Sequence, residues 1–199
     1  MTSLTPAQMA EMNGKTFPFR DVIKGVEGHD VLEFNNPALL DAIKTACTNT
    51  VTIINKSTNF TGRPNEFGNL VANFLSLECS KIGLDYQKPT DTDNKAKETG
   101  YPDGLIKYEN TWCYLEIKTC EHTKTEQTFR TFFYSPSVTS KIIHDAPHLL
   151  VGFETDKDGD TFILNGKFYI TDMFKKNVTL KLEYNTNNKQ LYKPEDLLN

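Results

Sequence analysis

The sequence predicts a mixed α/β protein in which helices pack against a central β-sheet. Three observations support this fold class. Apolar residues recur at helical spacing in two segments, 38–46 and 63–82. Two apolar runs at 103–108 and 111–118 are separated by a two-residue turn, and further β-rich runs follow from residue 148 onward. Helical and strand periods in one chain are typical of a sheet covered by helices.

Turn and cap residues divide the chain into these elements in order. The first 35 residues alternate turn signals with short apolar groups, and we expect them to wrap the core. Asn36 and Pro37 begin the first helix, because Asn caps a helix and Pro is tolerated in its first turn. Arg63 to Ile82 forms the second helix, with Pro64 at its start and Gly83 after its end.

Strands dominate the second half of the chain. Asp103 to Tyr108 and Thr111 to Lys118 form a hairpin around the turn at Glu109 and Asn110. Ser137 to His144 is predicted to be a short helix. The other predicted strands are Leu84 to Gln87, His148 to Glu154, Thr161 to Leu164, Phe168 to Ile170 and Val178 to Tyr184.

Composition limits the class of protein. With 199 residues, 38% hydrophobic and 24% charged, residues 1–199 are expected to form a single domain. Four scattered cysteines without CxxC spacing argue against a zinc ribbon or a disulfide framework. We expect no membrane segment, and a cytoplasmic location because the N-terminus lacks the features of a secretory signal. The net charge of −4 does not by itself suggest a nucleic-acid partner.

The predicted hairpin brings three ionisable residues together. Asp103 stands at the start of its first strand, while Glu116 and Lys118 lie two apart on the second and therefore leave the same face. Pairing through the Glu109 turn places Asp103 opposite the end that carries Glu116 and Lys118. A cross-strand ion pair on a solvent-facing hairpin would account for the same pattern.

Phosphodiester hydrolysis requires this combination of groups. Two hard carboxylate oxygens, from Asp103 and Glu116, suit Mg²⁺, and the backbone carbonyl of Ile117 is a further candidate ligand. Lys118 is then placed to orient or deprotonate the attacking water, or to stabilise negative charge.

Pro102-Asp103 followed by Glu116-Ile117-Lys118 resembles the PD-(D/E)xK signature of restriction endonucleases and related nucleases. The resemblance implies a restriction-endonuclease-like fold, a central mixed β-sheet flanked by helices. It also implies a Mg²⁺-dependent type II restriction endonuclease that cuts double-stranded DNA at a short recognition site as a homodimer. In such nucleases an acidic residue on a preceding helix often joins the site, and Glu66 matches it.

The segment after Lys118 is dense in hydroxyl and basic side chains, which suit phosphate and base-edge contacts. The DNA-binding candidates are Lys124, Gln127, Arg130, Tyr134 and Lys141. Two alternatives stay open. One is a structure-specific or repair nuclease of the same superfamily, and the other is a DNA-binding module on this fold that lacks catalysis.

Overall fold

The computed structural model describes residues 5–95, 99–124, 132–137, 139–183 and 185–196. The chain divides into two compact units: Pro18–Lys176, and Met1–Phe17 together with Asn177–Asn199. Each unit is described by itself below, and the expectation of a single domain over residues 1–199 stays a prediction. Among the described residues, no helix combines the length and the apolar character that crossing a bilayer requires.

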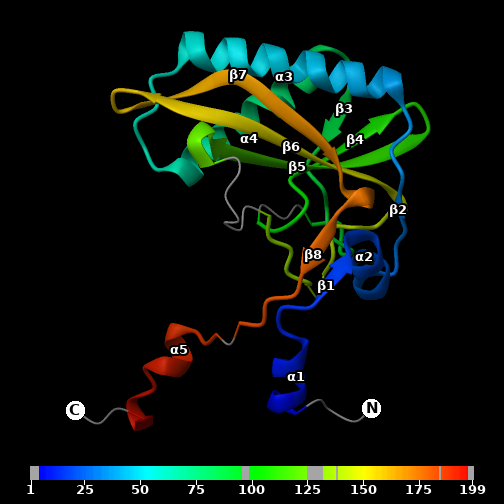
Figure 1. Ribbon diagram of the computed structural model, residues 1–199, viewed down its shortest axis with the longest axis vertical. Coiled ribbons are helices and arrows are strands. Elements are labelled where there is room, and N and C mark those ends of the chain that lie inside the picture. Colours follow the sequence, from blue (N-terminus) through cyan, green and yellow to red (C-terminus); the bar gives the residue numbers. More distant parts are fainter. Residues whose placement is uncertain (1–4, 96–98, 125–131, 138, 184, 197–199) are drawn as a thin grey trace. The chain divides into compact units, whose positions relative to one another are not determined.

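The larger unit is built on a six-stranded mixed sheet in the order β2-β6-β5-β4-β3, with β7 pairing with β6 (Figure 1). The strands β5 and β6 run parallel, as do β2 and β6, whereas the β3–β4, β4–β5 and β6–β7 pairs are antiparallel. The strand bounds are Val31–Leu32 (β2), Asp85–Gln87 (β3), Gly104–Tyr108 (β4), Thr111–Glu121 (β5), Ala146–Asp158 (β6) and Thr161–Asp172 (β7).

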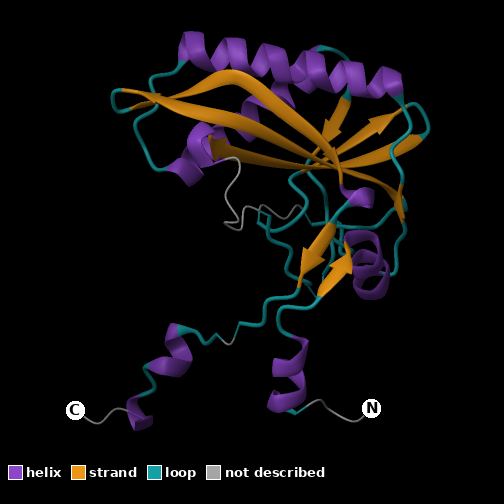
Figure 2. Ribbon diagram, in the orientation of Figure 1, coloured by secondary structure: helices purple, strands orange, loops and turns teal. Residues whose placement is uncertain are grey.

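Two long helices, α3 (Pro37–Ser57) and α4 (Pro64–Lys81), supply the hydrophobic core on one face of this sheet (Figure 2). Leu115 and Ile117 of β5 belong to that core together with Val151 of β6. Since side chains alternate along a strand, Glu116 and Lys118 leave β5 on the opposite face. The mixed sheet with flanking helices confirms the predicted fold class.

The opposite face is partly covered by aromatic residues. Phe19 begins α2 (Phe19–Glu27) and packs edge-on against His148 of β6, with ring centroids 5.7 Å apart. His148 in turn lies 4.7 Å from the ring of Tyr114 on β5. This cluster covers the part of the sheet that precedes Glu116 along β5. The stretch of β5 from Glu116 to Lys118 lies beyond the cluster.

Most predicted elements are confirmed. Asn36 caps α3, since its side-chain oxygen accepts from the N–H of Leu39 at 2.9 Å. The helix α4 ends before Gly83, which adopts a left-handed φ of 86°. The β4–β5 hairpin pairs Tyr108 with Thr111 as expected.

Two local predictions are wrong, and residues 19–27 form the helix α2 in a stretch for which the sequence predicts no helix. Among the described residues of the predicted strand 178–184, only those up to Thr179 are in a strand. The described residues between 139 and 144 are irregular instead of helical. There the N–H groups of Ile143 and His144 donate to the hydroxyl of Tyr114 at 2.8 and 3.2 Å, a tertiary partner that replaces helical carbonyls.

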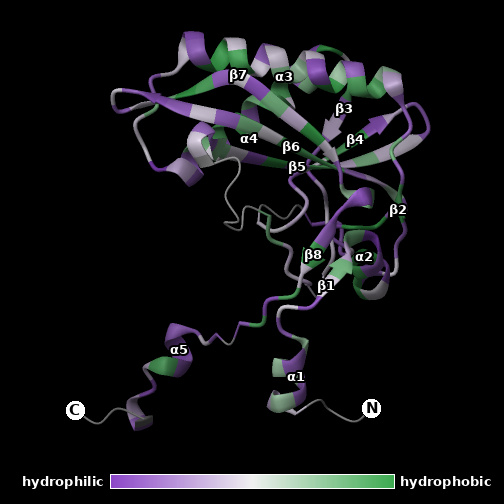
Figure 3. Ribbon diagram, in the orientation of Figure 1, coloured by the Kyte–Doolittle hydropathy of each residue, from purple (hydrophilic) through white to green (hydrophobic). Residues whose placement is uncertain are grey.

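The smaller unit holds short elements from both ends of the chain. The strands β1 (Thr16–Pro18) and β8 (Asn177–Thr179) pair with each other. The helix α1 (Pro6–Met12) begins with a capping box in which Thr5 and Gln8 bond each other's backbone. The helix α5 (Asn188–Leu191) forms one turn. The hydropathy colouring in Figure 3 shows that α1 and α5 carry polar as well as apolar residues.

Candidate active site

The register of the β4–β5 hairpin places Asp103 beside the middle of β5. Gly104 pairs with Leu115, and the N–H of Asp103 donates to the carbonyl of Leu115 at 3.0 Å. One carboxylate oxygen of Asp103, Oδ2, accepts from the N–H of Ile117 at 2.8 Å. The Asp103 side chain is therefore held against the backbone between Glu116 and Lys118.

Gly104 allows this close approach. An added Cβ at this position would lie 2.2 Å from the hydroxyl oxygen of Tyr86 on β3. Gly104, which follows Asp103, therefore has room only for the hydrogen atom of a glycine. The Tyr86 ring packs over this start of β4.

Glu116 and Lys118 form an ion pair on the face away from the helices. The distance between Lys118 Nζ and Glu116 Oε1 is 2.5 Å. The Glu116 side chain is only 4% exposed, whereas that of Lys118 is 31% exposed. The carboxylate thus forms the buried floor of the site, and the ammonium group reaches toward solvent.

Burial raises the pKa of Glu116 to about 7, and the nearby charge of Asp103 adds to this effect. The ammonium groups of Lys118 and, more weakly, Lys141 oppose the rise. The second carboxylate oxygen of Glu116, Oε2, is buried and accepts no hydrogen bond from any described residue. A buried acceptor without a donor is costly for a protein unless a cation or water binds it.

Lys141 lies behind the site instead of on an exposed surface. It is 5% exposed, and its Nζ donates to the carbonyls of Gly100 at 2.5 Å and Pro102 at 2.6 Å. These bonds fix the loop that leads into Asp103. Such a placement suits a support of the site, and the DNA contact of Lys141 stays a prediction. Because Lys141 is far from Asp103 in the sequence, only the tertiary structure reveals this placement.

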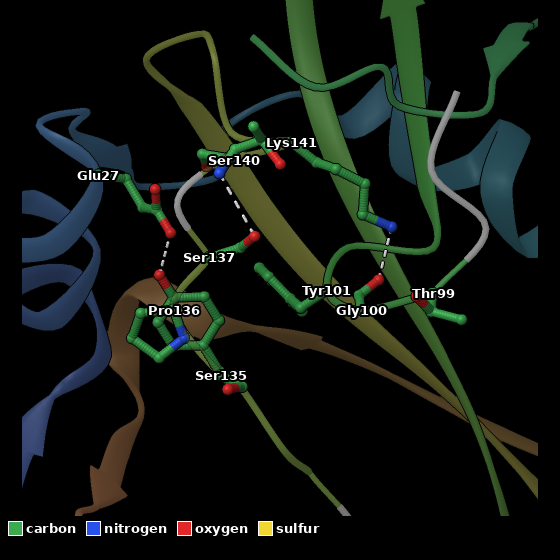
Figure 4. Close-up of a pocket in the computed structure, with 11 residues that line it drawn as sticks. Glu27, Thr99, Gly100, Tyr101, Ser135, Pro136, Ser137, Ser140 and Lys141 are labelled. Atoms are coloured by element: carbon green, nitrogen blue, oxygen red, sulfur yellow. Dashed lines mark hydrogen bonds between the residues drawn. The ribbon is translucent and has the colours of Figure 1, made fainter. Parts of the chain in front are cut away.

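A pocket opens beside this loop, between Gly100, Lys141 and the segment around Ser137 (Figure 4). Tyr134 lines it, and its hydroxyl donates to the carboxylate of Glu27 on α2. The predicted DNA-binding Tyr134 is therefore bound within the pocket wall.

Glu66 is occupied at the start of its own helix. Its Oε1 accepts from Arg63 Nη2 at 2.5 Å, and its Oε2 accepts from the Arg63 backbone N–H at 3.1 Å. These bonds lower the pKa of Glu66. The structure places the carboxylate in the cap of α4, where its hydrogen bonds come from Arg63. Its role in catalysis stays a prediction.

Of the three remaining DNA-binding candidates, one lies just before residues 125–131, which the structure does not describe, and two lie within them. Lys124 ends a short 3-10 turn, His122–Lys124, directly after β5. Gln127 and Arg130 lie outside the described residues. Within the described part of the chain, no group of three or more His, Cys, Asp or Glu residues is arranged to hold a metal ion. Any metal at this site would depend on two carboxylates and other oxygen donors.

Comparison with known proteins identifies the family of this chain. A family model of the type II restriction enzyme MjaV family matches residues 12–195. The chain belongs to this family. It is also similar to the type II restriction enzyme MjaV of Methanocaldococcus jannaschii, with 29% identity over 198 residues that cover 89% of this chain and 85% of the relative.

Membership in this family confirms the predicted type II restriction endonuclease. The enzyme is a site-specific deoxyribonuclease, and its substrate is DNA. The assignment also favours restriction over the alternatives of a structure-specific repair nuclease and a non-catalytic binding module. The match extends over both compact units of the chain.

Proposed function

We propose that this enzyme cleaves both strands of DNA at a short recognition site in a Mg²⁺-dependent reaction carried by Asp103, Glu116 and Lys118. The observation that carries the proposal is the buried Glu116 Oε2, which no described donor satisfies. A divalent cation is the partner that such an oxygen suits, since burial and then the charge of Asp103 raise the pKa of the same carboxyl group and disfavour its ionised form in the absence of a cation.

The residues that would hold the ion fit its chemistry. Mg²⁺ prefers carboxylate and carbonyl oxygens, and Asp103, Glu116 and the backbone carbonyl of Ile117 offer these. The N–H of Ile117 points to the edge of β5 from which Asp103 comes. Because the N–H and C=O of one strand residue point to the same edge, we expect the Ile117 carbonyl to face Asp103 as well. When bound, Mg²⁺ lowers the pKa of water and offsets charge on the phosphate.

Lys118 is the group placed to act on the attacking water and on the charge that develops on the phosphate. Its ammonium lies 2.5 Å from Glu116 Oε1 and is partly exposed, so it can contact a phosphate or a water molecule above the sheet. In hydrolysis, the water oxygen bonds to phosphorus, one P–O bond breaks, and the leaving oxygen takes up a proton. Lys118 orients the water and stabilises the charge that builds up on the phosphate.

The test is cleavage of unmethylated phage DNA by the purified enzyme with Mg²⁺. We expect discrete fragments that disappear with EDTA and with the Lys118→Ala variant. Lys107→Ala is the matched control, because Lys107 lies on β4 of the same hairpin and contacts the Trp112 ring, 5.4 Å from its centroid. Full activity of Lys118→Ala, or activity unchanged by EDTA, would contradict the proposed mechanism.

Assembly into a homodimer and a cytoplasmic location are part of the same proposal. A two-fold symmetric dimer presents one active site to each DNA strand, which suits cleavage of both strands at a palindromic sequence. Sedimentation of the purified enzyme tests the dimer directly.

A further inference from the structure

A second buried carboxylate, Glu154, lies on the same face of the sheet as Glu116 and Lys118. In the parallel β5–β6 pair, Lys118 is opposite Gly152 and Cys120 is opposite Glu154. Residues two apart on β6 share a face, so Glu154 lies next to Gly152 on the active-site side. Its side chain is 2% exposed.

Glu154 is surrounded by donors. Its Oε2 accepts from Asn165 Nδ2 at 2.9 Å and from His122 Nδ1 at 3.0 Å, and its Oε1 accepts from the Tyr169 hydroxyl. Lys167 Nζ lies 4.0 Å away. The Tyr169 bond, followed by those of Asn165 and His122, lowers the pKa of Glu154 to about 2. The group is thus ionised and holds each donor in a fixed direction.

The side chains that Glu154 anchors are themselves exposed. The exposed fractions are 49% for His122 and 62% for the Lys167 side chain, and Tyr169 is 52% exposed. We call these three residues the Glu154 platform. They come from two segments, the 3-10 turn after β5 and the middle of β7, and a single buried charge joins them.

A glycine lies between the platform and Lys118 on the sheet. Lys118, Gly152 and Tyr169 are in register across β5, β6 and β7. Gly152 is partly exposed, and a Cβ added there would make an ordinary van der Waals contact with Leu150 Cδ2, at 3.8 Å. A partly exposed glycine in a central strand carries no side chain that would hold a ligand away from the backbone.

We propose that the Glu154 platform binds the sugar–phosphate backbone of the DNA strand next to the phosphate that is cut, with the strand passing over Gly152. The inference rests on the proposed cleavage at Lys118. Tyr169 is two strand spacings from Lys118, on the order of 10 Å. Successive phosphates of one strand are ~3.4 Å apart along the duplex axis, so the platform meets the same strand within a few nucleotides of the cut.

Each platform residue has a distinct contribution. Lys167 supplies a charge for a phosphate oxygen, and its flexible stem can turn from Glu154 to the ligand. The imidazole of His122 is held by Glu154 through Nδ1. The Tyr169 ring, whose hydroxyl is committed to Glu154, offers an apolar surface to a sugar. Because such contacts meet the backbone, they strengthen binding without reading sequence.

The experiment is the salt dependence of DNA binding. Affinity for a short labelled duplex is measured by fluorescence anisotropy in EDTA, from ~50 to ~200 mM KCl, for the wild type, Lys167→Gln and Lys157→Gln. Lys157 is the matched control, since it lies on the same β6–β7 hairpin but over the ring of the core residue Phe162, 4.7 Å from its centroid. Loss of one phosphate contact makes the slope of log affinity against log salt shallower by about 0.9.

We expect this change of slope for Lys167→Gln alone, on any duplex sequence. An unchanged slope for Lys167→Gln, an equal change for Lys157→Gln, or absence of DNA binding by the wild type would overturn the inference. Cleavage with Mg²⁺ is measured in parallel. Cleavage into fragments without a change of slope for Lys167→Gln would support the proposed function and contradict DNA binding by the Glu154 platform. A change of slope without cleavage would support DNA binding by the platform and contradict the proposed function.

A second variant tests, independently of charge, whether the DNA strand passes over Gly152. Gly152→Val adds a side chain that β-strands favour, at a position where the structure shows space for a Cβ. We expect weaker DNA binding at every salt concentration, an unchanged slope, and a thermal midpoint close to that of the wild type. Wild-type affinity for Gly152→Val would show that DNA does not pass over β6.

Discussion

The stability of the enzyme without metal should depend on the protonation of Glu116. Burial raises the pKa of this carboxyl group from 4.5 to about 7. The folded state therefore holds the proton more tightly than the unfolded chain does. Between pH ~4.5 and ~7, the free energy of unfolding should fall as pH rises, because the folded protein must either keep the proton or bury a charge.

The magnitude follows from the two pKa values. Each tenfold change in proton affinity corresponds to ~1.4 kcal/mol, so a rise from 4.5 to about 7 costs the folded state about 3 kcal/mol at pH 8. The Glu116 side chain is only 4% exposed, so solvent screens this cost weakly. Glu116→Gln removes the titration while keeping the shape of the side chain.

The assay is urea denaturation of the wild type and Glu116→Gln in EDTA, at pH values below 4.5 and above 7. The difference between the two proteins is the relevant quantity, since other groups titrate in both. Glu116→Gln should gain about 3 kcal/mol relative to the wild type on going from acid to alkaline pH. Adding Mg²⁺ at the higher pH should stabilise the wild type and leave the variant unchanged.

A difference that stays constant across this pH range would refute the reasoning. It would mean that Glu116 is ionised in the folded state at no cost, and that the neighbouring ammonium groups fully compensate its burial. Equal stabilisation of both proteins by Mg²⁺ would place the ion away from Glu116.

Three further predictions concern other parts of the fold. Glu154→Gln should be less stable than the wild type near neutral pH, and the gap should close as pH falls from 4.5 toward 2, since the pKa of Glu154 is lowered to about 2; denaturation across that range measures it. Asn36→Ala should lose about 1 kcal/mol of stability with unchanged cleavage, because it removes the cap on the Leu39 N–H. Gly104→Ala should reduce cleavage and the thermal midpoint together, since its Cβ would lie 2.2 Å from the Tyr86 hydroxyl; a thermal midpoint equal to the wild type's would contradict that contact.

Local patterns predict the hairpin that carries the site. A two-residue turn between two apolar runs sets the register of an antiparallel pair, and this register alone places Asp103 beside Glu116 and Lys118. The helices α3 and α4 were likewise predictable, since their starts carry proline and their apolar residues follow the helical period.

Distant contacts decided what the patterns could not show. Lys141 resembles any lysine of a polar segment until the fold brings it to the carbonyls of Gly100 and Pro102. Glu154 lies in an apolar strand, and its donors come from the 3-10 turn after β5 and from β7. The segment 139–144 is irregular because Tyr114 supplies the partner for its N–H groups.

The sequence by itself determined where the candidate chemistry lies, because the catalytic candidates lie on one hairpin whose geometry depends on neighbouring residues. Only the tertiary structure decided the environment of that chemistry. Burial raises the pKa of Glu116 and leaves its Oε2 without a donor among the described residues. This burial results from packing across strands and loops far apart in the chain. No local period encodes such packing, since it depends on which residues the whole fold brings together.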